Sequence, residues 1–269
     1  MGLSFPPTEQ CDIAVVIPTV LRPSLLRAVD SVFSQDFAGT LHLLIGVDKA
    51  TSGRDVLDRL AGKRPDNVFI TILDPGFSTS QRHGGLWPAH DGGALRTVLS
   101  YLAHSRFIAY LDDDNWWAPN HLTSLREAIE GKGWAFSRRW FTLPDSDLAL
   151  CEDIWESVGP GGGEYAAVFG GWSDPNTIMI DKVLCEPVLR GWCHPIPGES
   201  TAMSADRRVF HNLKETYAWA ETGRATVYYQ LNPNDPEHPN RWARIQNGLA
   251  SQQFLSVDLA PIIHDSHWV

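Results

Sequence analysis

The 269-residue sequence lacks the features that mark several large classes of protein. No two of its four cysteines have the CxxC spacing of zinc sites, because Cys11, Cys151, Cys185 and Cys193 are scattered. No apolar run reaches about 18 residues, the length that a transmembrane helix requires. The first ten residues carry neither the basic region nor the apolar run of a signal peptide. We therefore expect a cytoplasmic protein with reduced thiols, and peripheral contact with the inner face of the membrane stays open.

An excess of basic charge is also missing. The net charge is −10, which disfavours nucleic acid and anionic membrane as general partners. An acidic protein can still bind an anionic nucleotide if a divalent ion lies between them. The apolar content of 43% and charged content of 20% are typical of a globular protein, and the length is enough for one large domain.

Strands and helices are predicted to alternate in the first half of the chain. The strands are expected at residues 13–17, 41–47, 68–73 and 106–111, and the helices at residues 23–29, 93–104 and 119–130. This order predicts an α/β fold with a mostly parallel central sheet and helices on both faces. Ligands of such sheets bind beyond the carboxyl ends of the strands.

The pattern in the second half is less regular. Strands are expected at residues 134–141, 176–180 and 225–230, a helix at residues 204–215, and irregular segments at residues 159–163 and 232–240. No internal repeat or low-complexity tract is present.

The most informative segment is the acidic triplet Asp112, Asp113 and Asp114, which directly follows the predicted strand at residues 106–111. Three adjacent carboxylates repel one another and are costly to bury, so they need water, cations or a metal ion. Oxygen ligands suit Mg²⁺ or Mn²⁺, ions that can hold a diphosphate. Thr19 and Asp48 also follow predicted strands, so three segments are expected to meet at one rim. The alternative is a solvated turn that caps the next helix.

Segments of the first 130 residues resemble the family 2 glycosyltransferases, which have the GT-A fold. The matching segments are residues 15–19 (VVIPT), residues 25–32 (LLRAVDSV) with Gln35, residues 91–96 (DGGALR) and residues 108–119 (IAYLDDDNWWAP). The strand-Pro-Thr opening combined with the later acidic triplet makes the resemblance specific. It implies a single GT-A domain over residues 1–269. In that domain, residues 1–130 would bind the donor, residues 131–230 the acceptor, and residues 231–269 would form a tail.

The resemblance also implies positions around the nucleoside. Pro18, Thr19 and Arg22 would border it, and Asp48 would approach the base or its ribose. The loop at Asp48 departs from the family, since it reads VDKA instead of two acidic residues followed by Gly and Ser. Arg96 would lie near the base and the acidic triplet.

Within the triplet, the resemblance implies that Asp112 or Asp113 holds the ribose and that Asp114 binds a divalent ion, Mn²⁺ or Mg²⁺. Asp112 is the second candidate ligand. A late histidine can complete the metal site in GT-A enzymes, which makes His238 a further candidate. Such an ion would stabilise the negative charge that develops on the departing diphosphate.

An inverting transferase also needs a base for the acceptor hydroxyl. In the family this is an acidic residue in the second half, often in a Glu-Asp pair that opens a helix, and no such pair stands here. Asp206 and Glu199 are the candidates. Asp206 is preferred because the arginines and apolar residues after it resemble the family's helix. Favourable pairing with the helix dipole is the alternative role of Asp206.

These features predict a hexosyltransferase that moves a sugar from a nucleotide-diphosphate donor, above all a UDP-sugar, to an acceptor hydroxyl with inversion. The acceptor stays open among a glycan, a lipid-linked molecule and a small molecule. A catalytically inactive nucleotide- or sugar-binding module is one alternative. A nucleotidyltransferase of related fold is another, although residues 19–23 lack the glycines of its phosphate loop.

Overall fold

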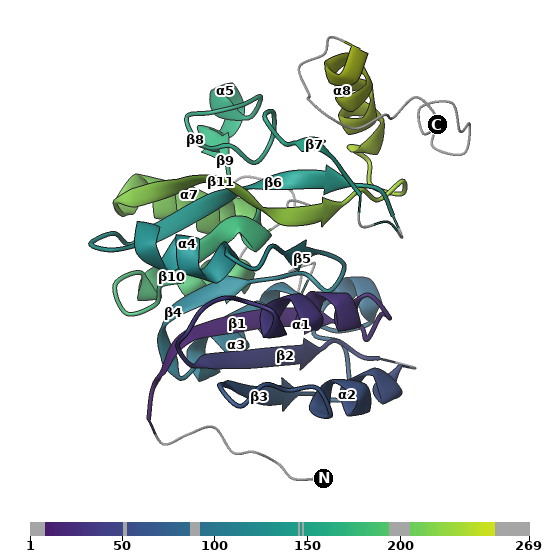
Figure 1. Cartoon of the computed structure of the whole chain (residues 1–269), viewed down its shortest axis with the longest axis vertical. Coiled ribbons are helices and arrows are strands. Elements are labelled where there is room, and N and C mark those ends of the chain that lie inside the picture. Colours follow the sequence, from purple (N-terminus) through teal and green to yellow (C-terminus); the bar gives the residue numbers. More distant parts are fainter. Residues whose placement is uncertain are drawn as a thin grey trace.

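A nine-stranded mixed sheet forms the centre of the protein in the computed structural model, which describes residues 9–50, 53–86, 92–144, 146, 148–193 and 205–250 (Figure 1). The strands are β1 (Cys11–Thr19), β2 (Leu41–Val47), β3 (Val68–Leu73), β4 (Ser105–Tyr110), β5 (Trp116–Trp117), β6 (Trp134–Thr142), β7 (Ala149–Glu152), β10 (Ile178–Asp181) and β11 (Trp219–Gln230). Their order is β3-β2-β1-β4-β10-β6-β11-β5, and β7 pairs with β6. The expected α/β fold is thus confirmed.

The strands of the first half are parallel, as predicted. β1 pairs in parallel with both β2 and β4, and β2 pairs in parallel with β3. The carboxyl ends of β1, β2 and β4 therefore lie along one edge of the sheet. β10 runs antiparallel between β4 and β6, so the sheet is mixed in the second half.

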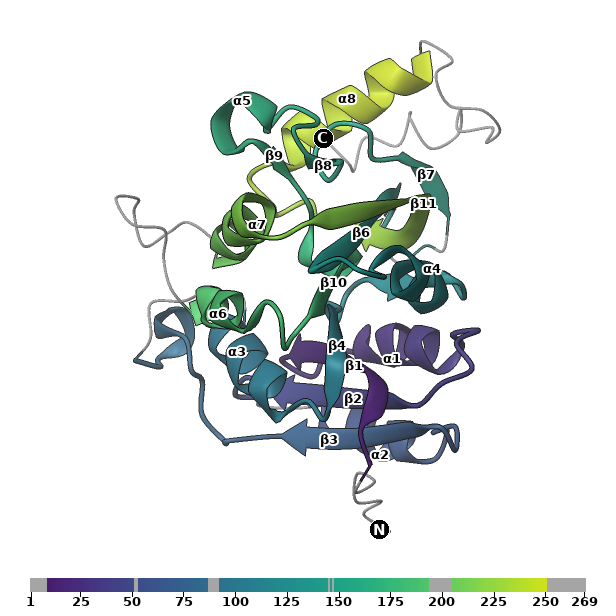
Figure 2. The same ribbon diagram turned by 90° about the vertical axis from the view of Figure 1, so that its left-hand side faces the viewer.

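Helices cover both faces of the sheet, as Figure 2 shows edge-on. On one face lie α1 (Leu25–Phe33), α2 (Arg54–Ala61) and α4 (His121–Ala128); on the other lie α3 (Gly93–Leu102), α6 (Glu186–Leu189) and α7 (Ala205–Thr216). Alternation along β1 explains the two cores. Ile13, Val15 and Ile17 are buried against the first set of helices, whereas Ala14 and Val16 face the second.

A third apolar cluster holds the last helix, α8 (His238–Ala250), against β6 and β7. Its members are Phe141, Leu143, Leu150, Cys151, Leu231, Trp242 and Ile245. The remaining short elements are α5 (Ala166–Phe169), β8 (Gly159–Pro160), β9 (Gly171–Trp172), η1 (Gln81–His83), η2 (Pro175–Thr177) and η3 (Arg190–Cys193).

Two expectations for the second half were wrong in their bounds. The segment 232–240 is not irregular throughout, because α8 begins at His238 and accommodates Pro239 in its first turn, where a missing N–H costs little. β11 begins at Trp219, six residues before the expected start, and a bulge between Glu221 and Ala225 explains why its alternation was hidden.

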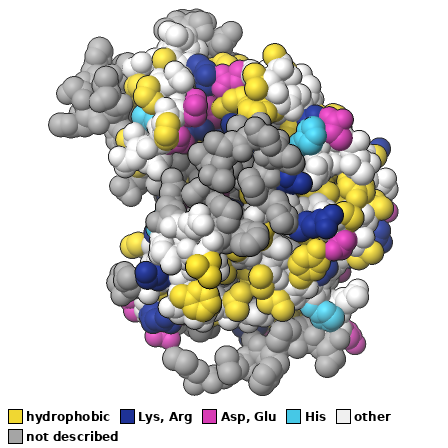
Figure 3. Space-filling view, turned by 180° about the vertical axis from the view of Figure 1, so that it is seen from behind, with side chains coloured by type: hydrophobic (Ala, Val, Ile, Leu, Met, Phe, Trp, Pro, Cys, Tyr) yellow, Lys and Arg dark blue, Asp and Glu magenta, His cyan; other side chains and the backbone are white. Residues whose placement is uncertain are grey.

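Hydrophobic side chains gather over part of the back face of the molecule (Figure 3). Val98, Tyr101 and Leu102 of α3 are exposed, as are Val183 and Leu184 just before α6.

No helix among the described residues is long and apolar enough to cross a membrane.

Burial of His121 predicts acid sensitivity of the fold. The imidazole is fully buried, stacks on Trp117 and shares a hydrogen bond of 2.7 Å with Thr226 Oγ1. Burial lowers its pKa from 6.5 to about 3. The unfolded chain therefore binds a proton below pH 6.5 that the folded chain does not. We expect the free energy of unfolding to fall by about 1.4 kcal/mol per pH unit from this residue alone.

Urea unfolding at pH 6.0, 5.5 and 5.0 measures this slope for the wild type and for His121→Gln. The variant should lose stability more gently on acidification, whatever its stability at pH 7. Equal slopes in the two proteins would show that His121 is not the acid-sensitive group.

Candidate functional site

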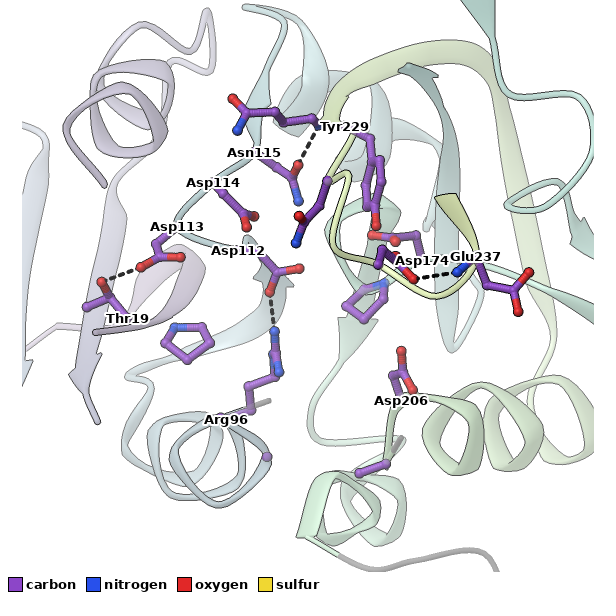
Figure 4. A pocket seen from close by; sticks show the side chains of 18 of the residues that line it. Thr19, Arg96, Asp112, Asp113, Asp114, Asn115, Asp174, Asp206, Tyr229 and Glu237 are labelled. Atoms are coloured by element: carbon purple, nitrogen blue, oxygen red, sulfur yellow. Dashed lines mark hydrogen bonds and ion pairs between the residues drawn. The ribbon is translucent and has the colours of Figure 1, made fainter. Parts of the chain in front are cut away.

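A cavity of about 670 Å³ opens at the carboxyl ends of β1, β2 and β4. Its wall on the side of the first half carries Pro18, Thr19, Arg22, Asp48, Arg96, Asp112, Asp113 and Asp114. Its wall on the side of the second half carries Arg139, Glu156, Tyr165, Trp172, Asp174, Asp206, Arg207, Tyr229, Asp235, Glu237 and Arg241. The expected convergence of strand ends is therefore found, and Asp206 lies in the same cavity (Figure 4).

Asp113 is the most buried member of the triplet and has partners at the end of β1. Thr19 Oγ1 donates a hydrogen bond of 2.6 Å to its carboxylate, and Arg22 Nη1 donates one of 3.1 Å. Burial nevertheless raises the pKa of Asp113 above its ordinary value. The side chain of Asp113 therefore links β1 to the end of β4.

Asp112 is held from two sides. Arg96 of α3 forms an ion pair with Oδ1, and Asn176 Nδ2 donates a hydrogen bond of 2.8 Å to Oδ2. The backbone N–H of Asp112 donates to Asn176 Oδ1 at 2.6 Å. Gly92 directly precedes α3, the helix that carries Arg96. Gly92 has a φ of +71°, and a Cβ added to it would lie 2.6 Å from the Pro18 side chain, so the chain needs glycine here. The carboxylate is thus oriented by residues from two further segments.

Asp114 is the most exposed of the three carboxylates, with 37% of its side chain accessible. Arg22 Nη1 donates to it at 2.8 Å. Burial of the site and the charges of Asp112 and Asp113 raise the pKa of Asp114 to about 7. Arg22 is shared between Asp113 and Asp114, so these two carboxylates have one cationic partner between them.

Asp48 lines the cavity at the end of β2 but is mostly engaged within the protein. Its carboxylate accepts hydrogen bonds from Ser78 Oγ at 3.1 Å and from the backbone N–H of Thr79 at 2.8 Å. The loop after β3 is thereby attached to the rim.

The far wall is built around a buried ion network. The guanidinium of Arg139, 1% exposed, donates to Asp153 at 2.7 Å, to Asp174 at 2.7 Å and to Glu156 at 2.9 Å. Glu156 in turn pairs with Arg241 of α8 at 2.8 Å. Three acids around one arginine satisfy its donors and raise its pKa further, so the group stays charged.

Asn176 connects this network to the acidic triplet. It is completely buried, and its Nδ2 donates to Asp174 Oδ1 at 2.6 Å as well as to Asp112. An amide can serve two carboxylates and one backbone N–H without adding charge. One chain of polar contacts therefore runs from Asp112 through Asn176 and Asp174 to Arg139.

Asp206 lies in the first turn of α7 and points toward the cavity from the side opposite the triplet (Figure 4). Its Oδ1 accepts a hydrogen bond of 2.8 Å from the backbone N–H of Arg207. Burial, together with the charge of Asp174, raises the pKa of Asp206 to about 7. A carboxylate with this pKa can take up or release a proton near neutral pH.

Two other candidates remain, and only one of them lies among the described residues. His238 is buried at the start of α8 and stacks on Trp242, with ring centroids 6.2 Å apart, and it is not part of the cavity wall. The role of His238 as a metal ligand therefore stays a prediction, and its position gives no support to it. Glu199 lies outside the described residues.

Several residues of the cavity were not expected from the sequence as site residues. Asn176, Arg139, Glu156, Tyr229 and Arg207 all reach it or support its wall. The only local signal was the Asp-Pro-Asn-Thr segment at residues 174–177, which has the composition of a turn. Within the described residues, no three His, Cys, Asp or Glu side chains are grouped to hold a metal ion.

Comparison with known proteins gives a partial sequence match and several structural likenesses. No family model matches the chain. Succinoglycan biosynthesis protein ExoW of Rhizobium meliloti is 34% identical over 121 residues, which are 44% of this chain. The chain matches 34% of the length of that relative.

Solved glycosyltransferase structures share the fold. TarS of S. aureus in complex with UDP-GlcNAc aligns with a TM-score of 0.58 at 13% identity, over 93% of this chain and 69% of that one. The mannosyltransferase PcManGT of Pyrobaculum calidifontis, in complex with GDP-Man and Mn²⁺, aligns with a TM-score of 0.56 at 14% identity. That alignment covers 98% of this chain and 71% of PcManGT. The expected GT-A fold is confirmed by these likenesses.

The position of Asn176 predicts a large stability effect. In Asn176→Ala, the N–H of Asp112 and the carboxylates of Asp112 and Asp174 lose buried hydrogen bonds. We expect the free energy of unfolding to fall by about 2–4 kcal/mol in urea titrations. Asn234→Ala is the matched control on the exposed rim and should change stability by less than about 0.5 kcal/mol. A loss in Asn176→Ala as small as that of the control would contradict the bridging role.

Proposed function

We propose that the protein is a glycosyltransferase that moves a hexosyl group from a nucleotide-diphosphate donor to an acceptor hydroxyl. The single observation that carries this proposal is one cavity with an acidic triplet on one wall and Asp206 on the other. The shared fold with TarS and PcManGT and the partial match to ExoW support it. The structures of those two enzymes contain UDP-GlcNAc in one case and GDP-Man with Mn²⁺ in the other, so both UDP- and GDP-sugars are donors to test.

A divalent ion, Mn²⁺ or Mg²⁺, fits the acidic triplet. Asp114 offers carboxylate oxygens at the accessible end. Burial and the charges of Asp112 and Asp113 raise its pKa, and a cation would offset the repulsion from those two charges. Mg²⁺ sites at phosphates often use only one or two carboxylates, so no three-residue cage is needed. Asp114 would hold the ion, with Asp112 beside it. When bound, the ion would stabilise the negative charge on the departing diphosphate.

Residues of the chain would orient the donor and accept the proton of the acceptor. Thr19 and Arg22 hold the Asp113 carboxylate in place, and Arg96 and Asn176 hold Asp112, so that the donor meets a preorganised wall. Asp206 on the opposite wall would accept the proton of the acceptor hydroxyl as it attacks the anomeric carbon. Attack from the side opposite the leaving group inverts that carbon. The placement of the acidic triplet and Asp206 on opposite walls of the cavity supports this geometry.

Metal-dependent nucleotide binding tests the role of Asp114. Titration calorimetry with UDP and GDP should show tighter binding in the presence of Mn²⁺. In Asp114→Asn we expect about 10- to 100-fold of this metal-dependent gain to be lost, since a charged ligand is replaced by a neutral one. Asp66→Asn, at an exposed site outside the cavity, serves as the control and should keep the gain. A full metal effect in Asp114→Asn would show that the ion binds elsewhere.

The pH dependence of turnover tests Asp206. Because its pKa is about 7 and the base must be ionised, the rate of sugar release from UDP-glucose, UDP-GlcNAc and GDP-mannose should fall about tenfold per pH unit below pH 7. Asp206→Asn should lower kcat by about 10²- to 10⁴-fold, remove this pH dependence and leave UDP affinity unchanged.

Two outcomes would count against parts of this proposal. An unchanged pH profile in Asp206→Asn would exclude Asp206 as the base. Metal-dependent nucleotide binding with no sugar release from any donor, in any tested acceptor mixture, would favour a binding module instead of an enzyme.

A further inference from the structure

The arginines of the cavity differ in whether a carboxylate of the protein pairs with their positive charge. Arg22, Arg96, Arg139, Arg207 and Arg241 line it. The first three and Arg241 form ion pairs with carboxylates of the protein. Arg207 forms no ion pair with any described residue, and its Nη1 is buried without a hydrogen-bond acceptor. Its positive charge is therefore offset less directly than that of the other four.

Aromatic rings hold the Arg207 guanidinium in place. Its Cζ lies 4.0 Å from the ring centre of Phe169, 4.9 Å from that of Tyr165 and 5.4 Å from that of Trp172. Cation–π contacts orient a guanidinium but do not neutralise it. The group is thus positioned before any ligand arrives, which lowers the entropic cost of binding an anion.

The position of Arg207 assigns it to the acceptor side of the cavity. It follows Asp206 on α7, and its backbone N–H donates to Asp206 Oδ1 at 2.8 Å. Figure 4 shows Asp206 across the cavity from Asp112, Asp113 and Asp114, where the donor diphosphate is proposed to bind. Asp174 and Glu156 on the same wall are paired with Arg139. Glu237 also lines the cavity, and its Oε2 accepts a hydrogen bond from Asn240. An anion at Arg207 would therefore lie beside the attacking hydroxyl and away from the leaving group.

Tyr165 and Trp172 add a second element of recognition. Both line the cavity while contacting the Arg207 guanidinium. Flat aromatic side chains next to a fixed cation suit a molecule with an apolar ring face and a negative substituent. A sugar that bears a carboxylate or a phosphate has this chemistry.

We propose that Arg207 binds an anionic substituent, a carboxylate or a phosphate, of the acceptor sugar, and that it thereby selects acidic acceptors. The inference rests on the proposed function, because it takes Asp206 to be the base for that acceptor. No covalent step at Arg207 is involved.

Binding of simple sugars tests this assignment. Glucose, glucuronate and glucose 6-phosphate are titrated into the protein in metal-free buffer, with and without UDP, and followed by saturation-transfer NMR and calorimetry. We expect the two anionic sugars to bind about 10- to 100-fold more tightly than glucose, the range of one or two charge-assisted hydrogen bonds. Stronger binding of glucuronate than of glucose 6-phosphate would identify a carboxylate as the preferred group, and the reverse would identify a phosphate.

The variants separate charge from packing. Arg207→Gln should abolish the preference for anionic sugars, and Arg207→Lys should keep part of it. Arg208→Gln removes the same charge one residue further along α7, outside the cavity wall, and should keep all of it. UDP affinity with Mn²⁺ should be equal in all four proteins, and thermal melting shows whether each variant is folded.

Three results would overturn the proposal: equal binding of the three sugars by the wild type, a preference that survives Arg207→Gln, or a loss of UDP affinity in that variant. The last result would assign Arg207 to the donor diphosphate. A protein that prefers acidic sugars through Arg207 but binds no nucleotide would keep this site and refute the proposed function instead.

Discussion

The crowding of three carboxylates at the end of β4 is the constraint on which the rest of the site depends. Adjacent negative charges in a partly buried position are stable only if other groups compensate them. The protein supplies Thr19 and Arg22 after β1, Arg96 from α3 and Asn176 from η2. The need to compensate the triplet thus explains why three distant segments meet at this point. Burial and the charges of Asp112 and Asp113 raise the pKa of Asp114 to about 7, and our proposal places the divalent cation at this residue.

Asn176 joins the two walls of the cavity. It contacts Asp112 on one wall and Asp174 on the other, and Asp174 continues into the ion network of Arg139. Through Glu156 and Arg241, that network extends to α8. A neutral amide is suited to the junction, because a charged residue there would either add to the repulsion or compete with Arg96 and Arg139. Buried hydrogen bonds of Asn176 therefore connect the two walls.

Neighbouring residues on α7 have different functions in our proposals. Asp206 is in an environment that raises its pKa to about 7, while Arg207 is stacked on aromatic rings with no ion pair to a described residue. Both lie on the wall opposite the triplet, so this short helical turn would carry the base and the recognition of the acceptor. The wall with the triplet contains residues from the segments that resemble the family, whereas on the opposite wall that resemblance indicated Asp206 and gave Arg207 no role.

The sequence by itself determined the strands and helices of the first half, the parallel order of their sheet and the position of Thr19, Asp48 and the acidic triplet at one rim. Each of these depends on residues close together in the chain, through apolar runs, turn residues and the regular geometry of parallel strands. It also indicated Asp206, which lines the cavity, and His238, which stacks on Trp242 and is not part of the cavity wall. Only the tertiary structure decided that Asn176 bridges Asp112 and Asp174. It also decided that Arg139 forms ion pairs with three carboxylates, and that Arg207 forms no ion pair with a described residue. These pairings join residues as far apart as 64 positions, as in Asn176 with Asp112, and they depend on the antiparallel insertion of β10 between β4 and β6. Local patterns of polarity contain no information about such an insertion. Unless the strand order is known, the sequence does not tell which acidic residue pairs with which arginine.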